Sequence, residues 1–404
     1  MKTLVNYLIS VAVVLSVGCL PSSVDQQRDV AFWHVKHTPD SILISYYRFI
    51  DDFNAQLNSL SDPTLSLLAL NAVTDAQFAW ALRLLNNDQP RAALPFWRVS
   101  VAQQNEDKRR QLSALLLRFE RWSDLESLKE QQLLPVASYA AEHLKLQHKV
   151  APQRIEQEFA NDEGFLLAFS QLKATPQCQF NVLLMTDHRQ GISQLTAFTH
   201  RYQQQPQPRA ASFCFSKPIY LGNTIDCQQQ PDSAAQCDWR PLIADKRWPT
   251  GFDFIVMMTA TGSGNVQGGI MHLNSASHYG LFLHELMHFN GFEDEYALPT
   301  AKQAWLCHQR GLVAPNLFIA NGLTPPAGWV LSDSCETGSK AYKPSADWSI
   351  MQYQQLPLSA QYQQLWLRKI SDPHYQPVRF TDYFQQIAPA MDFTNKTVNK
   401  NIAE

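Results

Sequence analysis

The sequence predicts an α+β protein in which an all-helical N-terminal domain precedes a domain that combines helices with a mixed, twisted sheet. Two observations support this prediction. From about residue 39 to 172, apolar residues recur at helical spacing without strand-like alternation. After residue 173, short β-branched and apolar runs are separated by glycine and proline, which is typical of buried strands and turns.

Length and composition bound the organisation of the chain. Its 404 residues suffice for two or three domains, and a hydrophobic fraction of 45% allows a substantial core. The net charge of -3 and the lack of a long basic run argue against nucleic acid as a partner. We expect a signal peptide over 1–18, a tether over 19–38, the helical domain over 39–172 and the α+β domain over 173–404.

The N-terminus resembles a bacterial export signal. An apolar run from Leu4 to Val17 has the length of a signal-peptide core and is short for a membrane span. The following Gly18-Cys19 resembles a lipobox, in which the cysteine becomes the lipid anchor, although Ser16 stands where leucine is usual. We expect an exported lipoprotein, held by Cys19 at the outer membrane or cell surface. An ordinary secretory signal, giving a periplasmic or secreted protein, is the alternative.

The cysteines are confined to one part of the mature chain. Six of the seven follow residue 175, and an even number in an exported protein favours disulfides. Proximity in the sequence favours the pairs Cys227–Cys237 and Cys307–Cys335, which leaves Cys178–Cys214. The sequence alone leaves other connectivities open.

In the helical domain, local signals mark several helix boundaries. Thr74-Asp75 offers an N-cap, and Pro90 suits the first position of a helix. Fragments around Trp97 and Trp122 faintly resemble tetratricopeptide-type repeats, but their period is irregular, so we expect helical hairpins only. The expected helices include residues 41–57, 74–85, 90–101, 112–119, 122–128 and 138–146.

The second domain alternates strand and helix patterns. Phe252 to Thr259 is the strongest strand in the chain, and Ser275 or Ser277 offers a cap for a helix that follows. Residues 222–250 and 297–345 are expected to be loops, the latter with short helices. The other expected elements are strands at 180–186, 211–215, 219–221 and 266–274 and a helix at 191–202.

The segment from His284 to Asp294 has the pattern H-E-x-x-H-x-x-G-x-x-D. His284 and His288 lie four residues apart, so both imidazoles share one helix face and can bind one zinc ion, with Glu285 beside it as a base. Gly291 can adopt a positive φ, end the helix and turn the chain, which brings Asp294 back as a third ligand. Three protein ligands leave an open position, as in catalytic zinc sites.

Other side chains near this segment are rival candidates. Glu293 and Glu295 carry carboxylates beside Asp294, but the offset of Asp294 from Gly291 fits the pattern better. His272 precedes the segment but misses the ligand spacing, as does His278. We expect both at the surface or supporting the ligands.

A second motif, S-I-M-x-Y, occupies Ser349 to Tyr353. Together the two motifs resemble the metzincin clan of zinc metallopeptidases, over roughly residues 176 to 370. The departure is Asp294, because the clan usually has histidine there. The resemblance implies a metzincin-like catalytic domain with Met351 as an apolar floor beneath the zinc, and Tyr353 as an extra ligand that can donate to the substrate oxyanion.

The resemblance implies a Zn²⁺-dependent peptidase acting on a protein or peptide, with Glu285 as general base. The run Asp294-Glu295-Tyr296 also resembles IgA-cleaving bacterial peptidases of the clan. A strand over Gly268 to Asn274 is expected to pair with an extended substrate. One alternative is a zinc-dependent amidase acting on cell-wall or other non-protein amides. Another is a surface binding protein with vestigial zinc, against which Glu285 argues, because a structural zinc needs no base.

Overall fold

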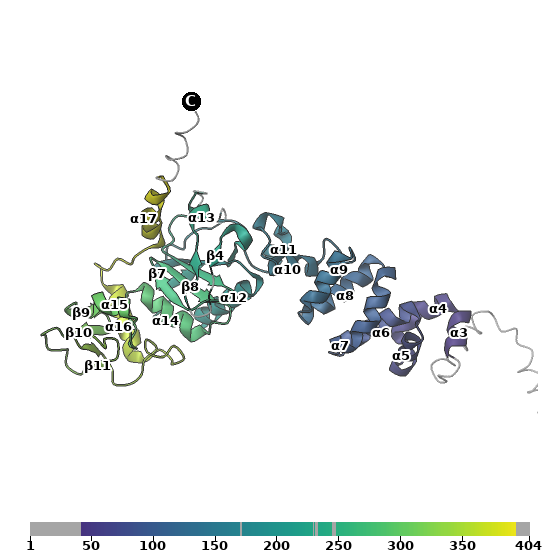
Figure 1. Cartoon of the computed structure of the whole chain (residues 1–404), viewed down its shortest axis with the longest axis horizontal. Coiled ribbons are helices and arrows are strands. Elements are labelled where there is room, and N and C mark those ends of the chain that lie inside the picture. Colours follow the sequence, from purple (N-terminus) through teal and green to yellow (C-terminus); the bar gives the residue numbers. More distant parts are fainter. Residues whose placement is uncertain (1–41, 170–171, 229, 231–232, 245–247, 393–404) are drawn as a thin grey trace, which may run out of the picture. The chain divides into compact units, whose positions relative to one another are not determined.

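The computed structural model describes residues 42–169, 172–228, 230, 233–244 and 248–392 (Figure 1). The predicted signal peptide, the tether and Cys19 lie outside these residues. The predicted fold class is confirmed, since a helical region over residues 42–162 precedes a region of mixed sheet and helices. The chain divides into two compact units between Leu144 and Lys145, within α10 (Tyr139–Gln147).

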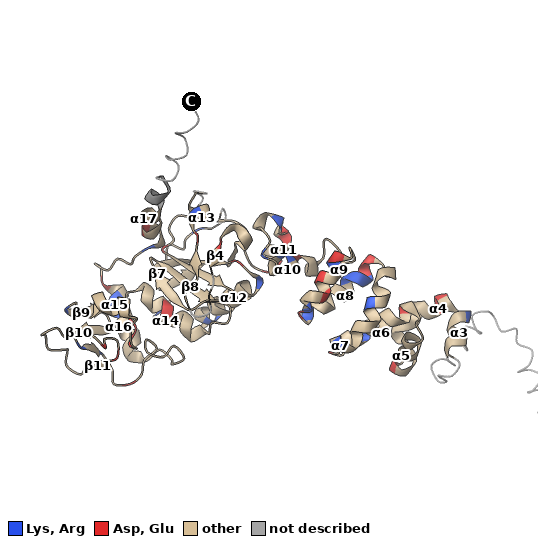
Figure 2. Cartoon of the chain, in the orientation of Figure 1, with Lys and Arg blue, Asp and Glu red and all other residues tan. Residues whose placement is uncertain are grey.

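In the first unit, successive helices pack on one another, α5 on α6, α6 on α7 and α8 on α9. Pro90 opens α7 as predicted, whereas Thr74 is the first residue of α6 and Val73 takes the N-cap position. Acidic and basic residues are interspersed along these helices (Figure 2). The helices are α3 (Ile42–Arg48), α4 (Ile50–Gln56), α5 (Asp62–Leu70), α6 (Thr74–Asn86), α7 (Pro90–Ser100), α8 (Glu106–Arg118) and α9 (Trp122–Glu130).

The second unit contains a six-stranded sheet with the order β2-β1-β6-β8-β7, in which β3 also pairs with β1. All its pairings are parallel except that of β7 with β8, which is antiparallel. The short β7 therefore lies at one edge with reversed direction. The strands are β1 (Phe180–Thr186), β2 (Phe213–Phe215), β3 (Ile219–Tyr220), β6 (Phe254–Thr259), β7 (Asn265–Gln267) and β8 (Ile270–Asn274).

Helices cover both faces of this sheet, which explains why β1 and β6 are buried and apolar throughout. Alternate residues of β1 enter two cores: Val182 packs with α12 (Arg189–Gln204), α14 (Tyr279–Phe289) and α16 (Ala360–Ser371), and its neighbour Leu183 packs on the opposite face. That opposite face is covered by α13 (Arg240–Ala244) and α17 (Phe380–Asp392). We call these the α14 face and the α17 face.

The single strand predicted over 266–274 is wrong, because the chain folds there into two strands, β7 and β8. Gly268 and Gly269 join them with φ of 58° and 75°, values that L side chains rarely adopt, so this pair forms the tight turn of a hairpin. A Cβ on Gly269 would also lie 2.3 Å from the backbone nitrogen of Phe380 in α17. The strand available for edge pairing is therefore β7, since β8 is enclosed between β6 and β7.

The two regions expected to be loops contain regular structure. Residues 222–250 hold α13 and the hairpin of β4 (Cys227–Gln228) and β5 (Gln236–Cys237). Residues 297–345 hold α15 (Thr300–Leu306) and a four-stranded antiparallel sheet, whose short strands lacked a clear periodicity. Its order is β11 (Val330–Ser332), β12 (Ala341–Lys343), β10 (Leu317–Ile319) and β9 (Gly311–Ala314).

Three disulfides tie the second unit together, Cys178–Cys214, Cys227–Cys237 and Cys307–Cys335. They are the pairs that proximity in the sequence favours, and disulfides of this kind indicate a compartment outside the cytoplasm. Within the part of the chain that the structure describes, no helix combines the length and apolar character needed to cross a membrane.

Candidate metal centre

The helix α14 carries the first motif, and both of its ends are capped. His278 is the N-cap residue, and its Nδ1 accepts a hydrogen bond from the backbone of Leu281 at 3.1 Å. The prediction of Ser275 or Ser277 as the cap is therefore wrong. At the other end Gly291 has a φ of 74°, and the Phe292 amide donates to the Met287 carbonyl at 3.3 Å. This arrangement ends the helix and turns the chain as predicted for Gly291.

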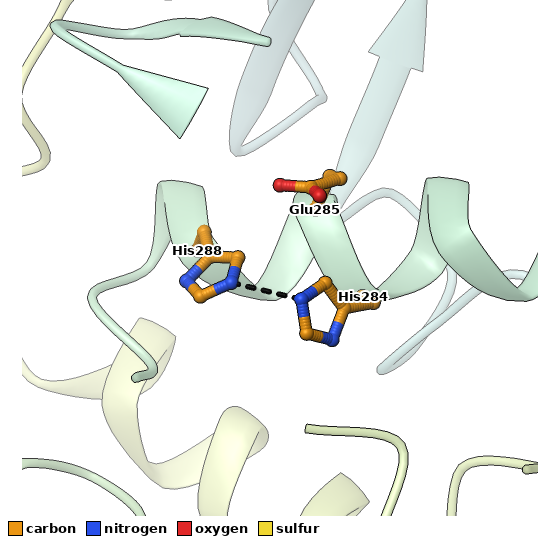
Figure 3. A group of neighbouring side chains, drawn as sticks. All are labelled: His284, Glu285 and His288. Carbon is orange, nitrogen blue, oxygen red and sulfur yellow. Dashed lines mark hydrogen bonds between the residues drawn. The ribbon is translucent and has the colours of Figure 1, made fainter. Parts of the chain in front are cut away.

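Three ligand atoms converge beside α14. The Nε2 atoms of His284 and His288 lie 3.0 Å apart, and each lies 3.1 Å from Oδ1 of Asp294. Figure 3 shows the two imidazoles turned toward each other on one side of the helix. Ligands at about 2.0–2.1 Å from a tetrahedral zinc ion are separated by roughly 3.3 Å. The three atoms therefore fit three corners of a zinc site, and these residues would hold the ion.

The other ring nitrogens fix the orientation of both imidazoles. His284 Nδ1 donates to the Ile350 carbonyl at 2.9 Å, and His288 Nδ1 donates to the Phe292 carbonyl at 2.8 Å. With Nδ1 as the donor, the neutral form of each ring has its lone pair on Nε2, facing the point where the two rings and Asp294 converge, which is how supporting hydrogen bonds prepare histidine to bind a metal. Both carbonyls belong to turns, at the end of α14 and in the second motif.

Glu285 is buried next to this group, with an exposed fraction of 3%. Its Oε2 has no hydrogen-bond partner among the described residues. A Cβ on Gly264, the residue before β7, would lie 2.6 Å from Glu285 Oε1, so glycine makes room for the carboxylate there. Burial raises the pKa of Glu285, although the histidine charges oppose this effect. A carboxylate with a raised pKa and a free oxygen is suited to accept and return a proton.

Protonation of the ligands follows from their proximity. Burial disfavours a charged His288, but the carboxylate of Asp294 outweighs burial and raises the pKa of His288 to about 9. The pKa of Asp294 is lowered below its usual range, because the two histidines outweigh the effect of burial. Without a metal, Asp294 is therefore an anion paired with an imidazolium, and metal binding must release that proton.

The two rival carboxylates have other partners. Glu293 forms an ion pair with Lys302 of α15, and its charge adds a smaller contribution to the raised pKa of His288. Glu295 is fully buried and accepts hydrogen bonds from Ser349 Oγ at 2.6 Å, Tyr362 Oη at 2.6 Å and Asn316 Nδ2 at 2.8 Å. Of these three carboxylates, only that of Asp294 contacts the imidazoles among the described residues, at 3.1 Å from each.

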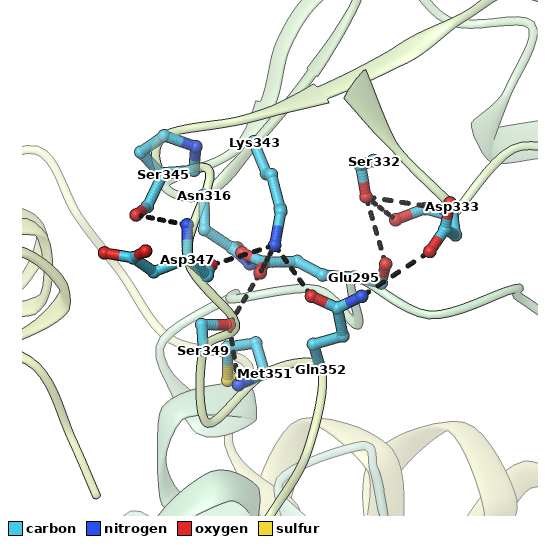
Figure 4. Close-up of polar contacts among 12 residues, drawn as sticks. Glu295, Asn316, Ser332, Asp333, Lys343, Ser345, Asp347, Ser349, Met351 and Gln352 are labelled. Atoms are coloured by element: carbon cyan, nitrogen blue, oxygen red, sulfur yellow. Dashed lines mark hydrogen bonds and ion pairs between the residues drawn. The ribbon is translucent and has the colours of Figure 1, made fainter. Parts of the chain in front are cut away.

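Glu295 joins the Asp294 segment to the second motif (Figure 4). Its backbone amide donates to the Met351 carbonyl at 3.0 Å, and Ser349 Oγ accepts from the Met351 amide at 3.1 Å. Burial raises the pKa of Glu295, while hydrogen bonds from Ser349, Tyr362 and Asn316 favour its charged form. Met351 itself is fully buried in the core beside α14. The turn predicted to lie beneath the histidines is thus held there by Ile350 and by Glu295.

Two tyrosines must be distinguished at the site. Tyr353 is 43% exposed, and its ring packs on Trp348 with 4.8 Å between centroids. Tyr296 is 37% exposed, and burial together with the nearby charges of Asp294 and Glu285 raises its pKa. The role of Tyr353 stays a prediction, and Tyr296 is a second tyrosine close enough to Asp294 for that carboxylate to affect its pKa. The sequence offered a signal for Tyr296, its position directly after Asp294-Glu295.

The remaining residues lie as follows. His278 supports the site by capping α14, and His272 belongs to the α17 face, because it lies on β8 between Met271 and Leu273, which face α14. Sequence reasoning missed Asn316, Tyr362, Ser332 and Ser334, whose side chains bond Glu295 or the backbone of 294–295. Such polar contacts across distant segments leave no local pattern in a sequence.

No protein-family model matches this chain, and no curated protein matches its sequence. The geometry of the site shows a buried His284-Glu285-His288 group on one helix that is able to hold a metal ion.

Proposed function

We propose that the protein is an exported, zinc-dependent endopeptidase of the metzincin type. One observation carries the proposal: two imidazole nitrogens and the Asp294 carboxylate converge at 3.0–3.1 Å beside the buried carboxylate of Glu285. Three protein donors with an open position, next to a base, are the set of a hydrolytic zinc site. A purely structural site would be closed by a fourth ligand and would need no base.

A zinc ion held by His284, His288 and Asp294 would supply Lewis acidity, which acidifies water and polarises an amide carbonyl. Glu285 takes the proton from the attacking water with its free Oε2 and delivers it to the leaving nitrogen. A tyrosine hydroxyl stabilises the developing oxyanion by donating a hydrogen bond. We assign this donor to Tyr296, whose pKa is raised by the nearby charges of Asp294 and Glu285, with Tyr353 as the rival from the family resemblance.

The substrate would lie in extended form along β7. This strand is at the edge of the sheet, and the residue before it, Gly264, abuts Glu285. Main-chain pairing with an edge strand aligns a peptide without requiring a particular side chain. Because Gly264 lies against the proposed base, the scissile bond would lie near the first residue of the strand.

Export and anchoring complete the proposal. The three disulfides fit an oxidising compartment, and Cys19 provides the lipid attachment that would hold the protein at a membrane. Replacement of Cys19 by serine should release the protein from the membrane fraction of expressing cells into the soluble exported fraction. Continued membrane association of Cys19→Ser would contradict the anchor.

The discriminating experiment compares two substrate classes. Zinc-loaded protein is incubated with casein and gelatin and, separately, with peptidoglycan fragments, beside the Glu285→Ala variant. We expect new peptide termini from the proteins, and none with Glu285→Ala. Cleavage of cell-wall fragments alone would replace the peptidase by an amidase, and activity that survives Glu285→Ala would contradict the assigned base.

A further inference from the structure

A polar cavity lies on the α17 face of the sheet, opposite the face that packs on α14. Its volume is about 410 Å³. The cavity is lined by Gln236 of the β4–β5 hairpin, by Trp239 just after β5, and by Asn265 and Gln267 of β7. None of the described residues that line it is an aspartate, glutamate, lysine or arginine. The described lining of the cavity is therefore polar and uncharged.

His272 of β8 lines this cavity and is its most unusual member. It is only 8% exposed, and neither Nδ1 nor Nε2 has a hydrogen-bond partner among the described residues. Burial lowers the pKa of His272 to about 4, so the ring is neutral at physiological pH and offers one donor and one acceptor. A buried polar group without a partner destabilises the folded protein, which points to a site that a ligand completes.

The pairing of β7 with β8 relates this cavity to the metal centre. Asn265 pairs directly with His272, and Gln267 pairs with Ile270. Directly opposed residues share a face, so Asn265 and Gln267 both point to the α17 face, while Val266 packs toward α14. The outer edge is occupied at Ser263, whose amide donates to the Ser233 carbonyl at 2.9 Å, so a substrate would pair with β7 beyond that point. Such a peptide strand would alternate in the same way, with every second side chain on the α17 face.

The distance along β7 from Glu285 to the cavity is short. Gly264 abuts Glu285, and Asn265 and Gln267 follow one and three residues later. At about 3.3 Å per residue, the cavity opens within roughly 10 Å of the base. A substrate whose scissile bond lies beside Glu285 would therefore place a side chain in this cavity. That side chain would belong to a residue one to three positions from the scissile bond.

We propose that this cavity is a specificity subsite for a carboxamide side chain, Asn or Gln, of the substrate. The proposal rests on the proposed peptidase function and names a preference within it. A carboxamide has both an acceptor and donors, which match the neutral ring of His272 and the amides that line the cavity. A carboxylate or ammonium group would be buried without a partner of opposite charge, which is costly, and an alkyl side chain would leave His272 unpaired.

The test uses peptides that differ at one position only. A positional scan first finds the residue, one to three places from the scissile bond, at which Gln matters. Peptides with Gln, Leu, Glu or Lys there are then compared by kcat/KM. We expect the Gln peptide to exceed the others by at least about 10-fold, because a site built to hydrogen-bond a group rejects analogues that lack it. Equal rates for all four peptides would overturn the subsite.

Two variants of His272 and one control variant test whether His272 causes the preference for Gln. His272→Leu should bring the Gln and Leu peptides to within about 2-fold of each other while the protein stays folded, because it removes an unpaired polar group. His272→Gln, which keeps a donor and an acceptor, should retain part of the preference. Gln228→Leu is the matched control, since Gln228 pairs with Gln236 in the same hairpin but does not line the cavity. An unchanged preference in His272→Leu would contradict the proposal.

A binding measurement separates this proposal from the peptidase. The imidazole signals of His272, identified by their absence in His272→Leu, are followed by NMR in zinc-loaded Glu285→Gln protein. The Gln peptide should shift them at concentrations where the Leu peptide does not. If the wild type cleaves no peptide but the shifts occur, the proposed peptidase function is contradicted and the proposed binding site is supported. If cleavage occurs without selective shifts, the subsite fails alone.

Discussion

His284 and His288 lie against one face of the central sheet, on α14, whereas His272 lies on β8 and belongs to the opposite face. Each imidazole of the α14 face has one nitrogen bound to a carbonyl and the other aimed at Asp294. The ring of His272 has neither contact. The α14 face is thus organised before any ligand binds, while the α17 face leaves a polar group for a ligand to satisfy.

Replacement of Asp294 is expected to have the largest effect on the α14 face. Loss of an outer partner of a metal ligand costs about 10–100-fold in affinity, so loss of a ligand itself in Asp294→Ala should exceed 100-fold. Zinc affinity measured by competition with a chelator tests this. Glu293→Ala is the matched control, because Glu293 pairs with Lys302 instead. A larger loss in Glu293→Ala would mean that the third ligand is misassigned.

The two tyrosines provide the next comparison. Tyr296→Phe should lower kcat by on the order of 10²-fold, because it removes a donor at the oxyanion and leaves the ring in place. Tyr353→Phe should change kcat by less than about 3-fold, since the exposed ring packs on Trp348. Steady-state kinetics of the two variants decide between them. The reverse ranking would restore the assignment that the sequence motif implies.

Glu295→Gln tests how the α14 face is held together. The substitution keeps the shape of the side chain but places an amide where Ser349, Tyr362 and Asn316 all donate to a carboxylate. An unsatisfied buried contact costs about 1–3 kcal/mol, so the free energy of unfolding should fall by that amount in chemical denaturation. Unchanged stability would show that the network contributes nothing to the turn around Met351.

Because the ring of His272 is buried on the α17 face, we expect the stability of the protein to depend on pH. The pKa of His272 is about 4 in the folded protein and 6.5 ordinarily, so the unfolded chain binds more protons between these values. This contribution to stability is complete above pH 6.5 and is lost as the pH falls toward 4. Between pH 7 and 5 the loss is roughly 2 kcal/mol. Denaturation at both pH values should show a smaller loss in His272→Leu, and equal losses would contradict the burial of a neutral ring.

Local patterns account for what the sequence predicted well. The spacing of His284 and His288, the helix end at Gly291 and the buried strand over 180–186 all follow from periodicity or backbone freedom within a few residues. The network around Glu295 was not predictable, because its donors come from positions 316, 349 and 362. The Gly268-Gly269 turn was a missed local signal, since two adjacent glycines are typical of a hairpin.

Metal content and hydrolysis, measured on the same preparations of wild type and Glu285→Gln, test the central claim most directly. We predict one zinc per chain in both proteins, with peptide hydrolysis lower in Glu285→Gln by about 10²–10⁴-fold, the contribution of a general base. Zinc absent from the wild type, or hydrolysis equal in the two proteins, would contradict the account.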